Sequence, residues 1–460
     1  MNQFDLSMLS EHAKIHFVGI GGISMSGLAQ MMLKKGFRVS GSDRTESEMT
    51  KRLAGMGAEI FIGHKAEQVH GADLVVHTAA VHSDNPELSE AARLGILTID
   101  RAALLGAVMK HFGHAVGVAG THGKTTTTSM LAHALVYAGT DPTISLGGEL
   151  DLIGGNVRLG DSDYFVTEAC EYTNSFLKFF PTVALITNID ADHLDFFHNL
   201  EEIVESFRKF ALLTKGRGCV IACGENENVK KALKDLDLDI CYYGLSEDYA
   251  FCAQNIRFEG GFPAFDVFSR GKHLCSLQLN VAGEHNILNA LAAVAVCDRL
   301  GIDPETAARG IETFHGVHRR FEKKGMYHGA AVIDDYAHHP TEIRATLKAA
   351  RSFPETAVKC VFQPHTYSRT RLLWEEFVEC FDLADELIIT DIYAAREEPD
   401  GVTDPAKLAE EIKKRGVNAR YMKTFAEIEE YLKNTLSEGD MLLTVGAGDV
   451  YKIGEAILKK

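Results

Sequence analysis

Short apolar runs alternate with amphipathic stretches along most of the chain. This alternation is typical of buried strands separated by helices whose apolar positions recur every three or four residues. The apolar runs that predict strands lie at 14–20, 38–40, 115–119, 163–167, 183–187, 330–333, 358–362, 387–390 and 441–445. Strand–helix alternation continues through 73–81, and the stretch 252–281 is strand-rich. Because strands that alternate with helices form parallel sheets with helices on both faces, the pattern predicts an α/β protein with doubly wound sheets.

A glycine-rich turn follows the run at 115–119 and precedes a predicted helix at 129–138. Its sequence is Gly120-Thr121-His122-Gly123-Lys124-Thr125-Thr126. Backbone N–H groups of such a turn can surround a phosphate, Lys124 can reach the outer phosphates, and the Thr125 hydroxyl suits Mg²⁺. The turn therefore predicts a nucleoside triphosphate site. The alternative is a glycine turn that only caps a core helix.

A second glycine motif follows the first predicted strand. It includes Gly21, Gly22 and Ser24 at the start of a helix, and Asp43 stands after the next strand. This pattern is typical of the first βαβ unit of a Rossmann-like fold. In such a unit the helix N-terminus can hold phosphate and the carboxylate can hold a ribose. Ser24 replaces the third fingerprint glycine, so the motif favours a nucleotide diphosphate over NAD. Thr78 lies at another strand end, where ligands collect, although a plain turn would have the same sequence.

Two strand ends in the middle of the chain carry candidate metal ligands. Glu168 and His193 each follow a predicted strand. Mg²⁺ prefers oxygen ligands, so Glu168 suits it, whereas His193 could equally contact the start of the next helix. Asp190, Asp192 and Asp195 could cap that helix.

Two polar pairs occur later in the chain. Asn286 and Asn289 are three residues apart and share one face of a predicted helix. A carboxamide can pair with adenine, although Asn286 could instead cap the helix. Arg319 and Arg320 stand at a predicted domain junction, where they could clamp a phosphate or be solvated surface residues.

Composition narrows the class of protein. The 460 residues favour about three domains. The formal charge of −17, from 47 basic and 64 acidic residues, argues against nucleic-acid binding. The nine cysteines form no Cys-x-x-Cys pair, which favours reduced thiols. No apolar run approaches the ~20 residues of a membrane helix. We therefore expect a cytoplasmic enzyme that has no membrane partner.

Taken in order, the motifs are similar to those of the Mur ligase family, and the resemblance covers nearly the whole chain. Its carriers are the segments 19–27 (GIGGISMSG), 120–127 (GTHGKTTT), 187–188 (TN), 192–193 (DH), 283–286 (GEHN), 318–321 (HRRF), 335–342 (DYAHHPTE) and 362–365 (FQPH).

The resemblance implies a three-domain ligase of peptidoglycan synthesis. A Rossmann-like domain at 1–110 would bind the UDP of UDP-N-acetylmuramate, a P-loop-type domain at 111–316 would bind ATP and Mg²⁺, and a Rossmann-like domain at 317–460 would close on them with L-alanine. The implied reaction joins L-alanine to the lactyl carboxylate of UDP-N-acetylmuramate through an acyl phosphate. We expect a monomer or a homodimer.

The resemblance also implies residue roles. The implied ATP-binding residues are Gly120, Thr121, His122, Gly123, Lys124, Thr125, Thr126, Asn286, Arg320 and Asp335, and the implied Mg²⁺ ligands are Thr125, Glu168 and His193. The expected sugar-nucleotide residues are Gly21, Gly22, Ser24, Asp43 and Thr78, and the implied amino-acid pocket consists of Tyr336, His338, His365 and Arg369. Lys124, His193 and Arg320 are the expected catalytic residues.

Three other functions are compatible with parts of the pattern. The N-terminal glycine motif alone could belong to a nicotinamide oxidoreductase, and the triphosphate turn alone could belong to a non-catalytic nucleotide switch. Within the family, a ligase that adds a whole murein peptide to the same sugar nucleotide is the nearest alternative. The amine of the incoming amino acid must lose a proton, and His193, His338 and His339 are all candidates to accept it.

Overall fold

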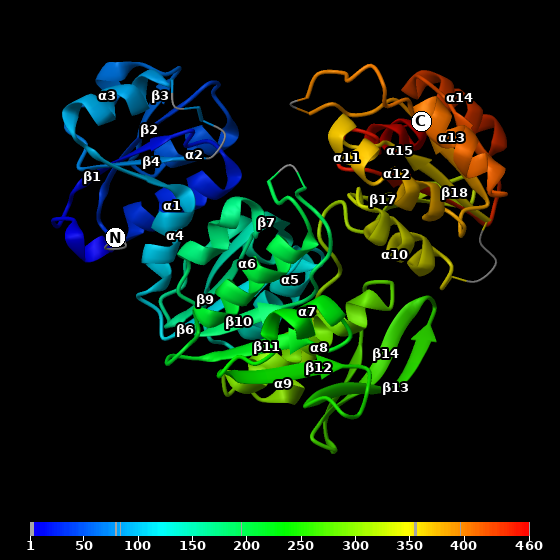
Figure 1. Cartoon of the computed structure of the whole chain (residues 1–460), viewed down its shortest axis with the longest axis horizontal. Helices are drawn as coiled ribbons and strands as arrows, with labels where there is room; N and C mark the ends of the chain where they lie inside the picture. The colour runs from blue at the N-terminus through cyan, green and yellow to red at the C-terminus, as the bar shows by residue number, and fades with distance from the viewer. Residues whose placement is uncertain are drawn as a thin grey trace. The chain divides into compact units, whose positions relative to one another are not determined.

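The computed structural model describes residues 4–78, 81–82, 84–194, 196–353, 357–395 and 397–459. Asp195, one of the possible helix caps, lies outside them. The chain divides into two compact units. The first consists of Met1–Asp190, Leu200–Tyr242 and Ala295–Asp303, and the second of Ala191–Asn199, Tyr243–Val294 and Pro304–Lys460. Figure 1 labels many of the helices and strands along the chain.

The first unit begins with a parallel sheet in the order β3-β2-β1-β4-β5. Its strands are β1 (Lys14–Val18), β2 (Arg38–Asp43), β3 (Glu59–Ile62), β4 (Leu74–His77) and β5 (Leu97–Asp100). Its helices are α1 (Ile23–Lys34), α2 (Glu48–Gly55), α3 (Pro86–Leu94) and α4 (Arg101–Met109). The strand order reverses between β1 and β4, and ligands of open sheets bind at such a switch point.

A second set of strands in this unit surrounds the glycine-rich turn. They are β6 (His114–Ala119), β7 (Thr143–Leu150), β8 (Gly155–Arg158), β9 (Tyr164–Glu168), β10 (Val183–Ile186), β11 (Cys219–Cys223) and β12 (Asp239–Gly244). The helices are α5 (Lys124–Tyr137), α6 (Leu200–Leu212) and α7 (Glu227–Leu233), with a 3₁₀ segment η4 (Tyr172–Lys178). β6 pairs in parallel with β9 on one side and β10 on the other, so the segments after all three meet at one sheet edge.

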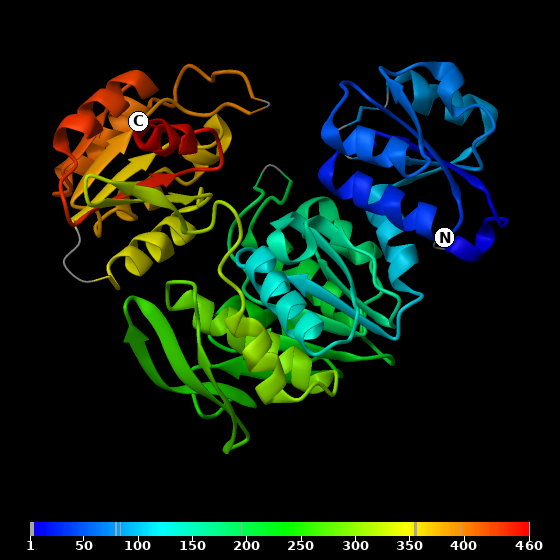
Figure 2. The same ribbon diagram turned by 180° about the vertical axis from the view of Figure 1, so that it is seen from behind.

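The second unit contains an antiparallel ribbon and two helices before its main sheet. The strands β13 (Phe251–Glu259), β14 (Phe262–Ser269) and β15 (Lys272–Gln278) pair in sequence. The long strands β13 and β14 lie side by side in both views (Figures 1 and 2). The helices α8 (His285–Arg299), whose residues from Ala295 onward are assigned to the first unit, and α9 (Pro304–Glu312) follow.

The last sheet has the order β16-β17-β21-β18-β19-β20 and is parallel except for β16. Its strands are β16 (Glu322–Tyr327), β17 (Ala330–Asp335), β18 (Ala357–Phe362), β19 (Glu386–Ile389), β20 (Ala419–Tyr421) and β21 (Asp440–Val445). Its helices are α10 (Pro340–Ala350), α11 (Tyr367–Leu372), α12 (Trp374–Glu379), α13 (Pro405–Lys414), α14 (Phe425–Thr435) and α15 (Tyr451–Leu458).

Successive residues of these strands enter cores on opposite faces of the sheet. Ile333 and Phe362 pack in one cluster, whereas their neighbours Val332 and Val361 pack in the other. Side chains alternate across a strand, so a continuous apolar run buries both faces. The predicted α/β class of doubly wound sheets is therefore confirmed.

Two predicted boundaries were wrong, by two residues at the end of the first strand and by five at the start of a helix. The first strand ends at Val18 because Gly19 turns the chain with a φ of 84°. The helix predicted at 129–138 begins at Lys124 instead. β-Branched threonines at 125–128 are poor helix formers and hid this start, but Gly123 provides the N-cap.

Candidate functional site

The turn after β6 requires glycine at two positions. Gly120 has a φ of 146°, and a Cβ placed on it would lie 1.9 Å from the Thr187 hydroxyl oxygen. Gly123 has a φ of 81° and precedes α5, whose N-terminus has no side-chain cap. The uncapped N–H groups and the helix dipole favour an anion at this end of α5. Thr126 is half-buried in the first turn of the helix.

Residues that follow β10 hold this turn in place. The Thr187 hydroxyl donates to the His122 carbonyl at 2.8 Å. Asn188 accepts the His122 N–H at 2.8 Å and donates to its carbonyl at 3.0 Å. The carbonyl of Asn188 also accepts the Thr121 N–H at 3.1 Å. The sequence placed Thr187 and Asn188 at a strand end but did not indicate that they position the turn.

Lys124 is paired with a buried carboxylate. Its ammonium group lies 3.0 and 3.2 Å from the two carboxylate oxygens of Glu171, whose side chain is 2% exposed. Burial disfavours the charge on Lys124, but Glu171 outweighs burial and holds the lysine pKa above its ordinary value. The lysine is therefore charged at neutral pH. Sequence reasoning missed the role of Glu171.

Two of the three predicted metal ligands come together. The Thr125 hydroxyl donates to one oxygen of Glu168 at 3.0 Å, and the Gly147 N–H donates to the other at 2.7 Å. A carboxylate beside a hydroxyl at a phosphate-binding turn is an oxygen donor set that fits Mg²⁺. His193 belongs to the second unit, where its backbone has a φ of 54°.

The predicted sugar-nucleotide residues gather at the switch point of the N-terminal sheet. Gly21 and Gly22 lie between β1 and α1, Ser24 is in the first turn of α1, and Thr78 directly follows β4. The Gly21 N–H donates to one oxygen of Asp43 at 2.8 Å. Gly22 caps α1 without a side-chain hydrogen bond, so this helix also has an N-terminus suited to phosphate.

The two asparagines of α8 do share a face. The Asn289 amide donates to the Asn286 side-chain oxygen at 2.9 Å, and the Asn286 amide donates to the Ala282 carbonyl at 2.7 Å. Both side chains are buried. Because α8 begins at His285, Asn286 lies inside the helix, and the alternative that it caps the helix was wrong.

The paired arginines have different surroundings. Arg319 donates to Asp334 at 3.1 Å and to the Gly446 carbonyl at 2.7 Å, and is therefore structural. Arg320 lies 3.5 Å from a carboxylate oxygen of Glu342, and its side chain is 35% exposed. Arg320 can therefore reach solvent and remains the candidate for phosphate binding.

Asp335, at the end of β17, is buried among hydrogen-bond donors. It accepts the Ala337 N–H at 2.8 Å, the Thr346 hydroxyl at 2.9 Å and the Phe321 N–H at 3.2 Å. Burial nevertheless raises the pKa of Asp335 to about 6, against the opposing charge of Arg320.

The four residues predicted for the amino-acid pocket do converge in the second unit. The guanidinium of Arg369 lies 3.1 Å from the ring of His365, and the rings of His365 and His338 are 5.7 Å apart. The ring of Tyr336 contacts that of His338 at 5.5 Å between centroids. Burial, assisted by the charges of His338 and Arg369, lowers the pKa of His365 to about 4.

Asp192 is an additional member of this cluster. It accepts from Arg369 at 3.1 Å and from the His193 N–H at 2.7 Å, so it does not cap α6, which begins at Leu200. Burial would raise its pKa, but His193 and Arg369 outweigh burial and hold the pKa well below its ordinary value. The cluster therefore contains an ionised carboxylate beside an arginine.

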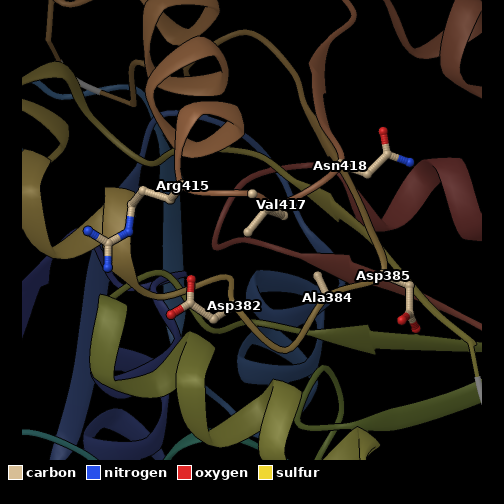
Figure 3. Close-up of a pocket in the computed structure, with 7 residues that line it drawn as sticks. Asp382, Ala384, Asp385, Arg415, Val417 and Asn418 are labelled. Carbon is tan, nitrogen blue, oxygen red and sulfur yellow. The ribbon is translucent and has the colours of Figure 1, made fainter.

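A separate pocket lies at the opposite edge of the C-terminal sheet (Figure 3). Its lining residues are Asp382, Ala384, Asp385, Arg415, Gly416, Val417 and Asn418. These residues directly precede β19 and β20, whereas Asp335 and His365 lie at the carboxyl ends of their strands. The pocket is therefore not part of the candidate site.

All nine cysteines are free thiols, as the spacing predicted. Among the described residues, no helix is both long and apolar enough to cross a membrane.

Three family models match successive parts of the chain. The Mur ligase family catalytic domain matches residues 14–113, the Mur ligase middle domain matches residues 118–297, and the Mur ligase glutamate ligase domain matches residues 319–448. Together they cover nearly the whole length.

Individual proteins match with similar coverage. The UDP-N-acetylmuramate–L-alanine ligase of Caldanaerobacter subterraneus subsp. tengcongensis is 52% identical over 453 residues, which is 98% of each chain. The crystal structure of the UDP-N-acetylmuramate–alanine ligase of Thermotoga maritima has a TM-score of 0.79 at 33% identity, over 97% of this chain and 99% of that one.

A third match has a different substrate in its name. The UDP-N-acetylmuramate:L-alanyl-γ-D-glutamyl-meso-diaminopimelate ligase of Neisseria meningitides has a TM-score of 0.61 at 31% identity. It covers 67% of this chain and 99% of its own.

Proposed function

The chain belongs to the Mur ligase family, and from this premise we propose that it joins L-alanine to UDP-N-acetylmuramate in peptidoglycan precursor synthesis. The reaction consumes ATP and forms an amide bond. Relatives at about half identity along the full chain carry this activity in their names.

The observation that carries this proposal is the turn at Gly120–Lys124 with its neighbouring Thr125–Glu168 pair. It combines an uncapped helix N-terminus, a charged lysine and a carboxylate beside a hydroxyl. Phosphoryl transfer depends on charge neutralisation and alignment more than on covalent chemistry by the protein. These groups supply both for a triphosphate.

In the first step the lactyl carboxylate attacks the γ-phosphate of ATP, and ADP leaves. The α5 N-terminus and Lys124 would hold the phosphates, and Arg320 would add a second positive charge. Thr125, Glu168 and His193 would hold Mg²⁺, whose charge would offset that of the phosphates. Asn286 and Asp335 would bind the nucleotide, and Gly21, Gly22, Ser24, Asp43 and Thr78 would bind the UDP-sugar.

In the second step the amine of L-alanine attacks the acyl phosphate, and inorganic phosphate leaves. Arg369 is suited to the carboxylate of the amino acid because it presents a planar donor group beside His365. Tyr336, His338 and His365 would form the remaining wall. Well-oriented reactants can lower a barrier by about 7–11 kcal/mol, which is a reason to hold both substrates in fixed pockets.

The test is mass spectrometry of the product formed from UDP-N-acetylmuramate, ATP and a mixture of L-amino acids. We expect a single product whose mass corresponds to the sugar nucleotide plus alanine minus water. A product without alanine would contradict the proposed specificity. Phosphate release without the sugar nucleotide would indicate a nucleotide switch, and a nicotinamide absorbance change without ATP would indicate an oxidoreductase.

A second candidate is supported by the peptide-adding relative from Neisseria. A ligase of that kind would accept L-alanyl-γ-D-glutamyl-meso-diaminopimelate in place of L-alanine. Competition between equal concentrations of the two acceptors decides between them, and we expect alanine to be incorporated. The monomer-or-homodimer state and the cytoplasmic location stay predictions.

A further inference from the structure

The proposed second step requires a proton acceptor, because the amine of L-alanine is protonated at neutral pH and cannot attack in that form. The sequence left three histidines as candidates: His193, His338 and His339. The structure surrounds each ring differently, and these differences distinguish between them.

His339 has both ring nitrogens committed to the backbone. Its Nε2 lies 3.1 Å from the Ala191 carbonyl, which can only accept, so Nε2 carries the hydrogen. Its Nδ1 accepts the Thr341 N–H at 3.3 Å and caps α10. The lone pair of the ring is therefore used within the fold, and His339 is a structural residue.

His193 is placed to serve another role. Its Nε2 lies 3.9 Å from the carboxylate of Asp192, and its backbone has a left-handed φ of 54°. In the proposed function its lone pair would hold Mg²⁺ and would not be available to a proton.

His338 is held in the opposite tautomer to His339. Its Nδ1 lies 3.0 Å from the Tyr336 carbonyl, which can only accept, so Nδ1 carries the hydrogen and Nε2 carries the lone pair. In the described part of the chain, no hydrogen bond involves Nε2 of His338. The side chain is 18% exposed, so the ring is partly open to solvent.

The groups around His338 suit a ring that takes up a proton and then releases it. Burial lowers its pKa below the ordinary 6.5, the charge of Arg369 lowers it further, and Glu342 and Asp192 oppose both. The ring is therefore neutral at physiological pH. Once protonated, it has the Glu342 carboxylate 3.4 Å from Nδ1, and Glu342 in turn faces Arg320. His365 and Tyr336 complete the surroundings of the ring.

We propose, on the basis of the function proposed above, that Nε2 of His338 accepts a proton from the α-ammonium group of L-alanine. The N–H electron pair stays on the amine. The amine nitrogen then bonds to the acyl carbon, the bond from that carbon to the phosphate oxygen breaks, and phosphate leaves with the electron pair. The second amine proton goes to the departing phosphate, and His338 returns its proton to solvent.

The test compares two acceptors in the full-length protein. Hydroxylamine is a nucleophile that is neutral at pH 7, so it traps the acyl phosphate as a hydroxamate without needing a base. In His338→Asn the amide nitrogen can replace Nδ1 as donor to the Tyr336 carbonyl, but nothing replaces Nε2. We expect L-alanine ligation to fall about 100-fold or more while hydroxamate formation is unchanged.

The pH dependence of kcat/KM is a second test, because a purely structural role of His338 would leave it unchanged. In the wild type, kcat/KM for L-alanine should fall below an apparent pKa under 6.5, and this acidic limb should be absent in His338→Asn. Glu342→Gln removes a group that raises the pKa of His338, so its limb should move to lower pH. The matched control His339→Asn, at a structural residue, should keep the wild-type limb.

Equal losses of ligation and hydroxamate formation in His338→Asn would overturn the proposal, as would an acidic limb that survives in that variant. Failure of the proposed function is a separate result, because then the wild type itself would form no hydroxamate from UDP-N-acetylmuramate and ATP.

Discussion

Lys124 and Glu171 show how a buried charge is held before a phosphate arrives. The carboxylate is almost fully buried and contacts the lysine through both oxygens. Removing one partner of a buried pair costs about 3–5 kcal/mol because the other charge loses its compensation. The pair therefore links the stability of the turn to its function.

Lys124→Ala should abolish phosphate release and lower the free energy of unfolding by about 3–5 kcal/mol, because the buried Glu171 carboxylate then lacks the compensating charge of Lys124. Phosphate assays and denaturant unfolding measure the two effects. Adding Glu171→Gln to this variant should recover most of the stability but none of the activity. Substantial turnover in Lys124→Ala would refute the assignment of the turn.

Asp335 should make stability depend on pH. Its folded pKa of about 6 lies above the unfolded value near 3.8, so the folded state binds the proton more tightly. The resulting stabilisation is fully present below pH 3.8 and is lost as the pH rises through 6. The difference between the two values corresponds to about 3 kcal/mol.

The prediction is tested by comparing the wild type with Asp335→Asn in urea unfolding from pH 4 to pH 7. The free-energy difference between them should shift by about 2 kcal/mol in favour of the variant over this pH range, because the unfolded carboxyl is already partly ionised at pH 4. A constant difference across this range would show that Asp335 titrates normally.

At the scale of elements, η4 joins two parts of the first unit. It follows Glu171 directly and packs against α4 of the N-terminal sheet, where a Cβ on Gly106 would lie 2.0 Å from the Lys178 carbonyl. Lys178 also pairs with Asp100, which caps α4. The segment that carries the partner of Lys124 is thus fixed by a close helix contact.

Gly106→Ala should lower the free energy of unfolding by about 1–3 kcal/mol, because the methyl group collides with backbone that cannot rotate away. Gly55→Ala is the control, since Gly55 is also helical, as the last residue of α2, and among the described residues no neighbouring atom lies within 4 Å of its Cβ position. Denaturant unfolding should leave the control unchanged or slightly more stable. Equal effects in the two variants would show that the α4 contact tolerates a side chain.

At the scale of the whole molecule, acidic residues outnumber basic ones, so local groups must attract the anionic substrates. The formal charge is −17, yet both nucleotide sites proposed in the first unit are helix N-termini, at α1 and α5. The electrostatic effect of a helix dipole falls off within about one helical turn. Each site can therefore bind its own ligand although the protein as a whole has no positive field.

Each nucleotide should therefore stabilise the protein independently. At about one hundred times its Kd, either Mg²⁺-ADP or UDP-N-acetylmuramate should add about 2.7 kcal/mol to the free energy of unfolding. Lys124→Ala should lose the gain from ADP and keep the gain from the sugar nucleotide. Loss of both gains in a thermal-shift assay would contradict two separate sites.

The sequence by itself determined the α/β class, the alternation of strands with helices, and the positions of the polar clusters after β1, β6, β9, β17 and β18. These features follow from local periodicity and from turn chemistry, which act over a few residues. Domain borders at 110/111 and 316/317 stay predictions, because local pattern carries little information about where contacts between domains stop.

Only the tertiary structure decided which side chains meet. Glu171 beside Lys124 and Asp192 beside Arg369 depend on segments brought together by strand pairing or helix packing. The tautomer of His338 depends on the local backbone, which places the Tyr336 carbonyl beside its ring. Apolar periodicity buries a face but does not specify its polar neighbours, and a hydrogen bond requires positions within a few tenths of an ångström. For that reason three histidines of equal standing in the sequence have three different surroundings in the fold.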